Sequence, residues 1–232
     1  MSSGEAVVPE PAPLDQARWI ALWTRIGARQ NGLQAFEQLA TAYAEPARAY
    51  HTAAHIRDCL TELDWSRGVA FHPDEVEVAL WFHDAVYVPG ASDNEVQSAH
   101  LARSVLEGGG VPADIRKRVG ELVLATQHVT VPRDPDAQHL CDIDLAILGR
   151  ETGEFDEFER RIRQEYAWVP EPAYRHSRAV VLSGFLRRRS IYLTREFANR
   201  YEARARQNLE RALAALSDGA LPDFSGPPPP RR

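Results

Sequence analysis

The stretch HPDEVEVALWFHDAVY, residues 72–87, predicts a helix that ends in reactive side chains. Proline in the first turn, followed by two acidic residues, is typical of a helix N-terminus. The spacing i, i+3, i+4, i+7 then selects one apolar face, formed by Val76, Ala79, Leu80 and His83. His83 should therefore point inward, beside Asp84. Since a buried aspartate is costly unless it is paired, Asp84 either binds a charge or hydrogen-bonds a neighbouring group.

The same helical spacing recurs along most of the chain, and strand patterns are nearly absent. We predict an all-α fold, a single helical domain of roughly nine to ten helices over residues 14–217, with helices packed ridge into groove. Residues 1–13 and the proline-rich residues 218–232 are predicted to be disordered. The helical segments are 14–28, 32–44, 52–66, 72–87, 92–110, 112–129, 136–149, 154–169, 172–190 and 195–217.

The composition favours a soluble protein of one large domain. The chain has 232 residues, 44% of them hydrophobic and 26% charged, with a net charge of −6. An acidic chain is a poor candidate for binding nucleic acid or an anionic membrane. No signal peptide or apolar run of about 20 residues is visible, and the two cysteines show no CxxC spacing. We therefore expect a cytoplasmic protein with reduced thiols.

Two further segments carry polar side chains where a helix needs apolar ones. In AYHTAAHIRD, residues 49–58, His51 and His55 lie four residues apart, which places them on one helical face. In LCDIDLAILG, residues 140–149, Asp144 shares a face with apolar residues, whereas Asp142 lies on another face and is expected to be exposed. Each feature alone also fits a structural role, such as a polar face or a salt bridge to an arginine. Together, two imidazoles and two carboxylates suit one divalent transition metal ion with positions left for water.

The order H…HD…D over several helices resembles the HD-domain superfamily of metal-dependent phosphohydrolases. Blocks between residues 50 and 209 resemble a bacterial family described as predicted HD-superfamily phosphohydrolases, namely YHTAAHI, ALWFHDAVY, NEVQSA, DIDLAILG, IRQEY and EARARQNL. The resemblance implies an HD-type helical fold and one divalent ion: Mn, Co, Ni, Fe, Zn or Mg. It also implies hydrolysis of a small phosphate ester, and superfamily analogy suggests a nucleotide.

The segment YHTAAHI is also similar to the YHNxxH segment of cyclic-nucleotide phosphodiesterases. That resemblance implies a division of roles in which His51 is the general acid, although the reverse assignment of His51 and His55 stays open. Metal-bound hydroxide would attack phosphorus, and Asp84 would both bind the ion and orient the water. The implied metal ligands are His55, His83, Asp84 and Asp144.

Other residues are candidates for substrate contact or for support of the ligands. Glu95 either forms a capping box with Ser92 or takes part in the site. His128 is a candidate site residue or second-metal ligand, and Arg178 a candidate phosphate contact. Arg163 and Glu165 are expected to have a structural role, in salt bridges on a helix surface or between helices. The remaining histidines, expected in packing or at the surface, are His72, His100, His139 and His176.

The sequence therefore predicts a metal-dependent phosphohydrolase, with two alternatives. A di-iron oxygenase of the same fold would need further histidine ligands, for which His100 and His128 lie in the right interval, but no adjacent histidine pair is present. A non-catalytic module could use the same pocket to sense a nucleotide or a metal, although such modules usually lack one of the ligands. The expected partner is a small phosphate ester rather than nucleic acid or membrane.

Overall fold

The computed structural model describes residues 14–217, and within these residues the fold is entirely helical. This confirms the all-α prediction, and each of the ten predicted segments overlaps one α-helix, although three helices begin one or two residues before their predicted segment. The helices are α1 Gln16–Arg25, α2 Gly32–Ala42, α3 Ala53–Ser66, α4 Pro73–Phe82, α5 Asn94–Gly108, α6 Ala113–Ala125, α7 Pro135–Asp144, α8 Thr152–Glu165, α9 Glu171–Leu186 and α10 Arg195–Ser217. Short 3₁₀ helices follow α3 (η1, Arg67–Val69) and α7 (η2, Leu145–Gly149). The predictions for residues 1–13 and 218–232 lie outside the described residues.

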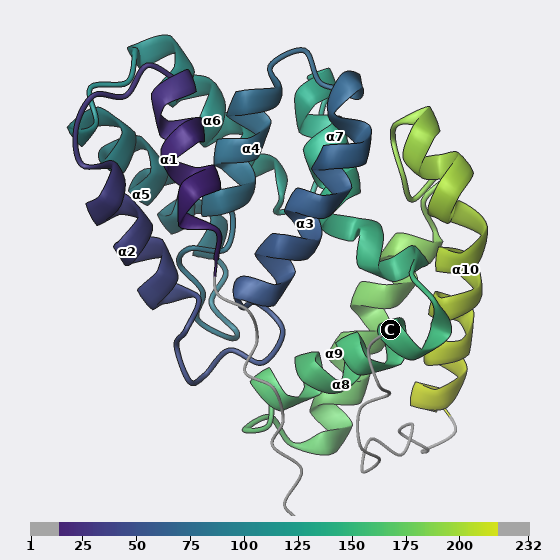
Figure 1. Ribbon diagram of the computed structural model, residues 1–232. Helices are drawn as coiled ribbons and strands as arrows, with labels where there is room; N and C mark the ends of the chain where they lie inside the picture. Colours follow the sequence, from purple (N-terminus) through teal and green to yellow (C-terminus); the bar gives the residue numbers. More distant parts are fainter. Residues whose placement is uncertain (1–13, 218–232) are drawn as a thin grey trace, which may run out of the picture.

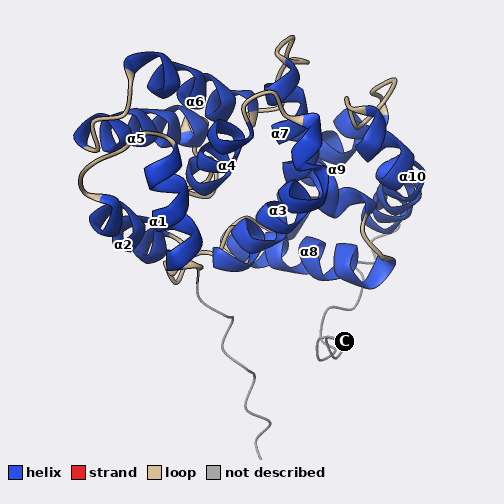
Figure 2. Ribbon diagram, turned by 45° about the horizontal axis from the view of Figure 1, so that its top comes forward, coloured by secondary structure: helices blue, strands red, loops and turns tan. Residues whose placement is uncertain are grey.

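The helices form two groups with α3 and α7 between them (Figures 1 and 2). One group contains α1, α2, α4, α5 and α6, and the other contains α8, α9 and α10. A continuous set of buried apolar side chains links the groups, from Leu14 to Ala212. No helix in the described part of the chain combines the length and the apolar character needed to cross a membrane.

Local signals set several helix starts. Asp15 accepts a hydrogen bond from the amide of Arg18 at 2.9 Å, and Asp134 caps α7 in the same way through Ala137. Proline occupies the first turn of both α4 and α7. These caps satisfy amides that a helix N-terminus otherwise leaves without partners.

Helix α4 is buried on every side rather than on one face, which corrects the amphipathic pattern predicted for it. From Glu75 to Phe82 every residue is buried, including two acids. Glu77 lies in ion pairs with Arg18 at 2.6 Å and with Arg67 at 2.7 Å. Because these arginines compensate the charge, the helix can run through the core with acidic residues in it.

Two local predictions were wrong. The capping box of Ser92 with Glu95 does not form, because α5 begins one residue later, after Asp93, without a side-chain cap. Asp142, expected to be exposed, is completely buried and accepts hydrogen bonds from the amides of Leu193 and Thr194 at 2.7 and 2.6 Å. Asp142 thus binds the backbone just before α10, 51–52 residues further along the chain. A contact between such distant segments leaves no local sequence pattern.

Candidate metal centre

Three helix ends bring the four predicted ligands together. His55 lies in the first turn of α3, His83 and Asp84 follow the last residue of α4, and Asp144 is the last residue of α7. Since helices α4 and α7 pack against α3, their C-terminal ends meet its N-terminal end. The predicted ligands are thus gathered from segments far apart in the sequence.

Four donor atoms form the donor cluster: His55 Nε2, His83 Nε2, Asp84 Oδ2 and Asp144 Oδ1. His83 Nε2 lies 3.1 Å from His55 Nε2 and 3.0 Å from Asp84 Oδ2. Asp144 Oδ1 lies 3.2 Å from His55 Nε2 and 3.5 Å from His83 Nε2, and Asp84 Oδ2 is 3.5 Å from His55 Nε2. Nitrogen and oxygen ligands that share an ion at about 2.1 Å are separated by about 3.0–3.4 Å, so the cluster fits such an ion.

Neighbouring groups orient two of these side chains. His83 Nδ1 lies 2.9 Å from the carbonyl oxygen of Leu80, which can only accept, so Nδ1 carries a proton and Nε2 is the nitrogen that faces the cluster. The outer oxygen of Asp144 lies 2.9 Å from His128 Nε2. His128 itself has a left-handed backbone (φ 54°), and its carbonyl accepts from Arg188 at 2.8 Å. His128 therefore orients the predicted ligand Asp144 through the carboxylate oxygen that does not belong to the donor cluster.

The charges in the cluster depend on one another. Burial alone would lower the pKa of His83, but Asp84 and Asp144 outweigh it and raise the pKa well above the ordinary value. Burial likewise opposes ionisation of the two aspartates, yet the neighbouring histidines, His83 for Asp84 and His128 for Asp144, lower the pKa of each carboxyl. Two carboxylates are thus held ionised in a buried site that favours positive charge.

Cys59 also reaches the cluster, one helical turn after His55 on α3. Its Sγ lies 3.7 Å from His55 Nε2, and burial raises the pKa of the thiol well above its ordinary value. Ligand atoms of His55, Cys59, His83 and Asp144 all lie within 4.8 Å of one another, and this group could hold a metal ion. Sequence reasoning treated Cys59 only as a reduced thiol.

His51 lies beside the cluster but not on the helix predicted for it. Helix α3 begins at Ala53 with Thr52 as its N-cap, so His51 belongs to the preceding turn. Its ring centroid is 6.1 Å from that of His55, and its ring stacks on Tyr87 at 4.1 Å. The predicted helical face shared by both imidazoles is therefore wrong, although the two rings are neighbours.

Glu165, predicted to form a structural salt bridge, holds that turn in place and pairs with His51, whereas Arg163 pairs with Glu171. Glu165 is buried on α8, and its Oε1 accepts from the amides of Ala49, Tyr50 and His51 at 2.8–3.0 Å. Its Oε2 lies 2.7 Å from His51 Nδ1. Burial would raise the pKa of Glu165, but these hydrogen bonds lower it to about 2. A carboxylate that accepts from Nδ1 fixes one proton there and leaves His51 Nε2 to exchange the other.

Burial lowers the pKa of His51, but Asp84 and Glu165 raise it, and the net shift is upward. The imidazolium of His51 is therefore favoured. A histidine whose pKa is raised keeps its second proton to higher pH and can donate it to a reacting oxygen.

Arg48, which sequence reasoning missed, binds the two segments of the site together. Its side chain is 1% exposed. The guanidinium donates to the carbonyl of His51 at 3.2 Å, to that of Asp84 at 2.6 Å and to that of Ala85 at 3.1 Å. One buried arginine thus fixes the turn with His51 relative to the end of α4.

The remaining candidates lie at different distances from the cluster. Burial raises the pKa of Glu95, and the charges of Asp84, His128 and Asp144 also act on it, so Glu95 lies within their electrostatic reach. Arg178 instead forms an ion pair with buried Glu159, which already compensates the charge that was predicted to meet a phosphate.

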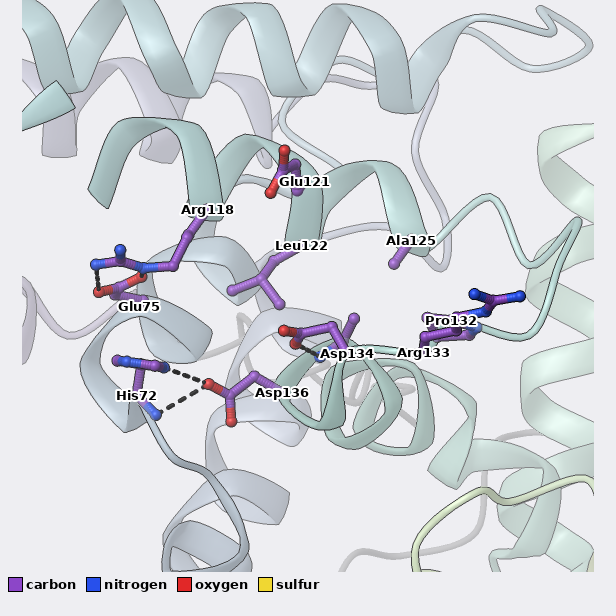
Figure 3. A pocket seen from close by; sticks show the side chains of 11 residues that line it. His72, Glu75, Arg118, Glu121, Leu122, Ala125, Pro132, Arg133, Asp134 and Asp136 are labelled. Atoms are coloured by element: carbon purple, nitrogen blue, oxygen red, sulfur yellow. Dashed lines mark hydrogen bonds and ion pairs between the residues drawn. The ribbon is translucent and has the colours of Figure 1, made fainter. Parts of the chain in front are cut away.

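Among the described residues, one hollow reaches the donor cluster and a larger one nearby does not. A narrow cleft of about 60 Å³ is lined by His55, Cys59, Asp144 and Arg150, among others. A larger hollow of about 190 Å³ lies between the starts of α4 and α7 and one face of α6 (Figure 3). Two pairs of its side chains interact, Glu75 with Arg118 and His72 with Asp136, and none of the predicted site residues lines it.

Comparison of the chain with protein-family models, with curated proteins and with solved structures finds no match. The resemblance to HD-domain phosphohydrolases therefore stays a prediction.

Proposed function

We propose that this protein is a metal-dependent phosphohydrolase that cleaves the phosphate ester of a small molecule. One observation carries the proposal: two imidazole nitrogens lie 3.1 Å apart and each is within 3.0–3.5 Å of two carboxylate oxygens, beside a histidine held by a glutamate. A divalent ion bound there would supply a Lewis acid and lower the pKa of coordinated water. The proposed ligands are His55, His83, Asp84 and Asp144.

The side chains around the cluster supply the remaining functions. Asp84 is 16% exposed at its side chain and can accept a hydrogen bond from the attacking water, which orients it. His51 donates the proton of its Nε2 to the departing ester oxygen, while Glu165 keeps the proton on Nδ1. Arg48 holds His51 and Asp84 at a fixed separation by donating to the carbonyl oxygens of both.

A nucleotide is the first substrate to test, and this part of the proposal rests on the analogy with HD-domain proteins alone. The experiment measures metal content and phosphate release together, over a panel of nucleotides and sugar phosphates with Mn²⁺, Co²⁺ or Mg²⁺. Asp84→Asn removes one charge from the cluster and keeps the shape of the side chain. Asp64→Asn is the matched control, because Asp64 is exposed and pairs only with Arg18 among the described contacts.

Phosphate release by the wild type and by Asp64→Asn, but not by Asp84→Asn, is the expected result. Metal retention without release over the whole panel would overturn the hydrolase. Iron analysis and oxygen consumption would then test the oxygenase alternative, and ligand-dependent thermal stabilisation without turnover would favour a sensing module. A wild type that retains no divalent ion would overturn the metal centre itself.

A further inference from the structure

The side chain of Cys59 lies among the donor atoms of the candidate metal centre. Four residues separate it from His55 on α3, so both point to one side of the helix. Its Sγ is 3.7 Å from Nε2 and 3.8 Å from Nδ1 of His55. The thiol also lines the narrow cleft that reaches the cluster.

These distances fit a shared ion. A sulfur ligand at about 2.3 Å and an imidazole nitrogen at about 2.1 Å from a tetrahedral ion are separated by about 3.6 Å, close to the distance found between Cys59 Sγ and His55 Nε2. The ligand atoms of His55, Cys59, His83 and Asp144 lie within 4.8 Å of one another, so the most widely separated pair must approach by up to about 1.2 Å to share a tetrahedral ion.

The second cysteine of the chain shows what a purely structural thiol looks like in this fold. Cys141 is also buried, but its Sγ donates to the carbonyl oxygen of Ala125 at 3.3 Å. The Sγ of Cys59 instead lies against the two ring nitrogens of His55, at 3.7 and 3.8 Å. Because the sequence contains only these two cysteines, a thiolate signal can be assigned to one or the other.

We infer that Cys59 is a sulfur ligand of this metal centre, together with His55, His83 and Asp144. The inference rests on the metal centre of the proposed function. A thiolate in the donor set favours Zn²⁺ or Co²⁺ over Mg²⁺ and Mn²⁺, because soft ligands bind soft ions more strongly. The site therefore selects a thiophilic ion. Cys59 joins the ligands of the proposed function, and Asp84, whose side chain is 16% exposed like that of Asp144, keeps its role of orienting water.

The test is the absorption spectrum of the Co²⁺-loaded full chain, prepared without oxygen. Thiolate coordination gives an intense sulfur-to-cobalt charge-transfer band in the near ultraviolet, whereas nitrogen and oxygen ligands give only weak bands in the visible. We expect this band in the wild type and in Cys141→Ser, and its loss in Cys59→Ser and Cys59→Ala with Co²⁺ still bound. We also expect the preference for Co²⁺ over Mn²⁺ to fall by on the order of tenfold in Cys59→Ser.

The outcomes separate this inference from the function on which it rests. Co²⁺ bound to the wild type without the band would overturn the sulfur ligand and leave the nitrogen and oxygen centre intact. Persistence of the band in Cys59→Ser would also overturn it. A wild type that binds neither Co²⁺ nor Zn²⁺ would overturn both the inference and the metal centre.

Discussion

Glu165 binds His51 at two points: its Oε1 lies 3.0 Å from the backbone amide and its Oε2 lies 2.7 Å from Nδ1 of the ring. Across 114 residues of chain, one carboxylate thus sets both the position of the imidazole and its protonation. This relationship makes His51 the most testable residue of the proposed mechanism.

Replacement of Glu165 by glutamine should shift the alkaline limit of activity to lower pH. The carboxylate raises the pKa of His51, and activity requires the protonated ring, so the neutral amide should let the proton leave earlier as pH rises. The measurement is kcat/KM as a function of pH, with metal content as a check. Glu157→Gln, on the same helix but paired with Arg160 and Arg161, is the control. An alkaline limb at the wild-type pH in Glu165→Gln would contradict this account.

His51 and His55 should differ in what their replacement removes. His51→Gln should keep the metal ion and lose turnover by about 10²–10⁴-fold, the usual contribution of a general acid. The loss should be larger for alkyl phosphates than for nitrophenyl phosphate, whose leaving group needs little protonation. His55→Gln should lose the ion itself. Metal analysis beside the two substrate series decides the matter, and loss of the ion from His51→Gln would reverse the assignment.

Replacement of Arg48 by methionine should weaken metal binding although Arg48 touches none of the donor atoms. Its loss leaves the carbonyl oxygens of His51, Asp84 and Ala85 without their donor, at a cost of about 1–3 kcal/mol for each buried group. Co²⁺ titration and urea unfolding measure the two effects. Arg133→Met, at an exposed arginine, removes a charge without this contact. If Arg48→Met binds Co²⁺ as tightly as the wild type, the end of α4 keeps its conformation without Arg48, which would contradict this prediction.

His139 should make the fold sensitive to mild acid. Ser66 Oγ donates to the carbonyl of Glu62 at 2.6 Å and lies 2.8 Å from His139 Nε2, so Nε2 carries the proton. The buried Nδ1 has no hydrogen-bond partner among residues 14–217. Burial lowers the pKa of His139 to about 4. The unfolded chain, with an ordinary pKa near 6.5, therefore takes up a proton first, and His139 should cost up to about 3 kcal/mol of stability as pH falls from 6.5 to 4.

The measurement is the free energy of unfolding in urea between pH 4 and 7, for the wild type and for His139→Gln. The comparison is needed because Asp142 acts in the opposite direction over the same range: burial raises the pKa of its carboxyl to about 6, so the folded state takes up that proton first. The stability of the wild type relative to the variant should fall toward pH 4. A difference in the free energy of unfolding between the two proteins that does not change with pH would rule out the proposed destabilisation by His139.

The sequence predicted the helices well because each has its own periodic pattern and most have a local start signal, such as Pro73 or Pro135. It also predicted that His83 and Asp144 point inward, since both interrupt an apolar face. Convergence with His55 followed only from the assumption of a shared ion, and the distances between the donor atoms now support it.

The features that sequence reasoning missed depend on contacts between distant segments. Arg48 and Glu165 act on backbone atoms of segments 36–37 and 114–116 residues away, and no periodicity reports such contacts. A buried Asp142 was missed for the same reason. Cys59 could have been found from its i+4 spacing to His55, the spacing that drew attention to His51.

Four carbonyl oxygens at the end of α4 have hydrogen-bond donors from side chains. The carbonyl of Leu80 accepts from the ring of His83 and that of Trp81 from Tyr43 at 2.9 Å, while Arg48 donates to those of Asp84 and Ala85. Helix ends usually fray because these groups lack partners. Here the segment that carries His83 and Asp84 should resist amide hydrogen exchange even without an ion. Its conformational entropy is lost on folding, so ion binding does not have to order it.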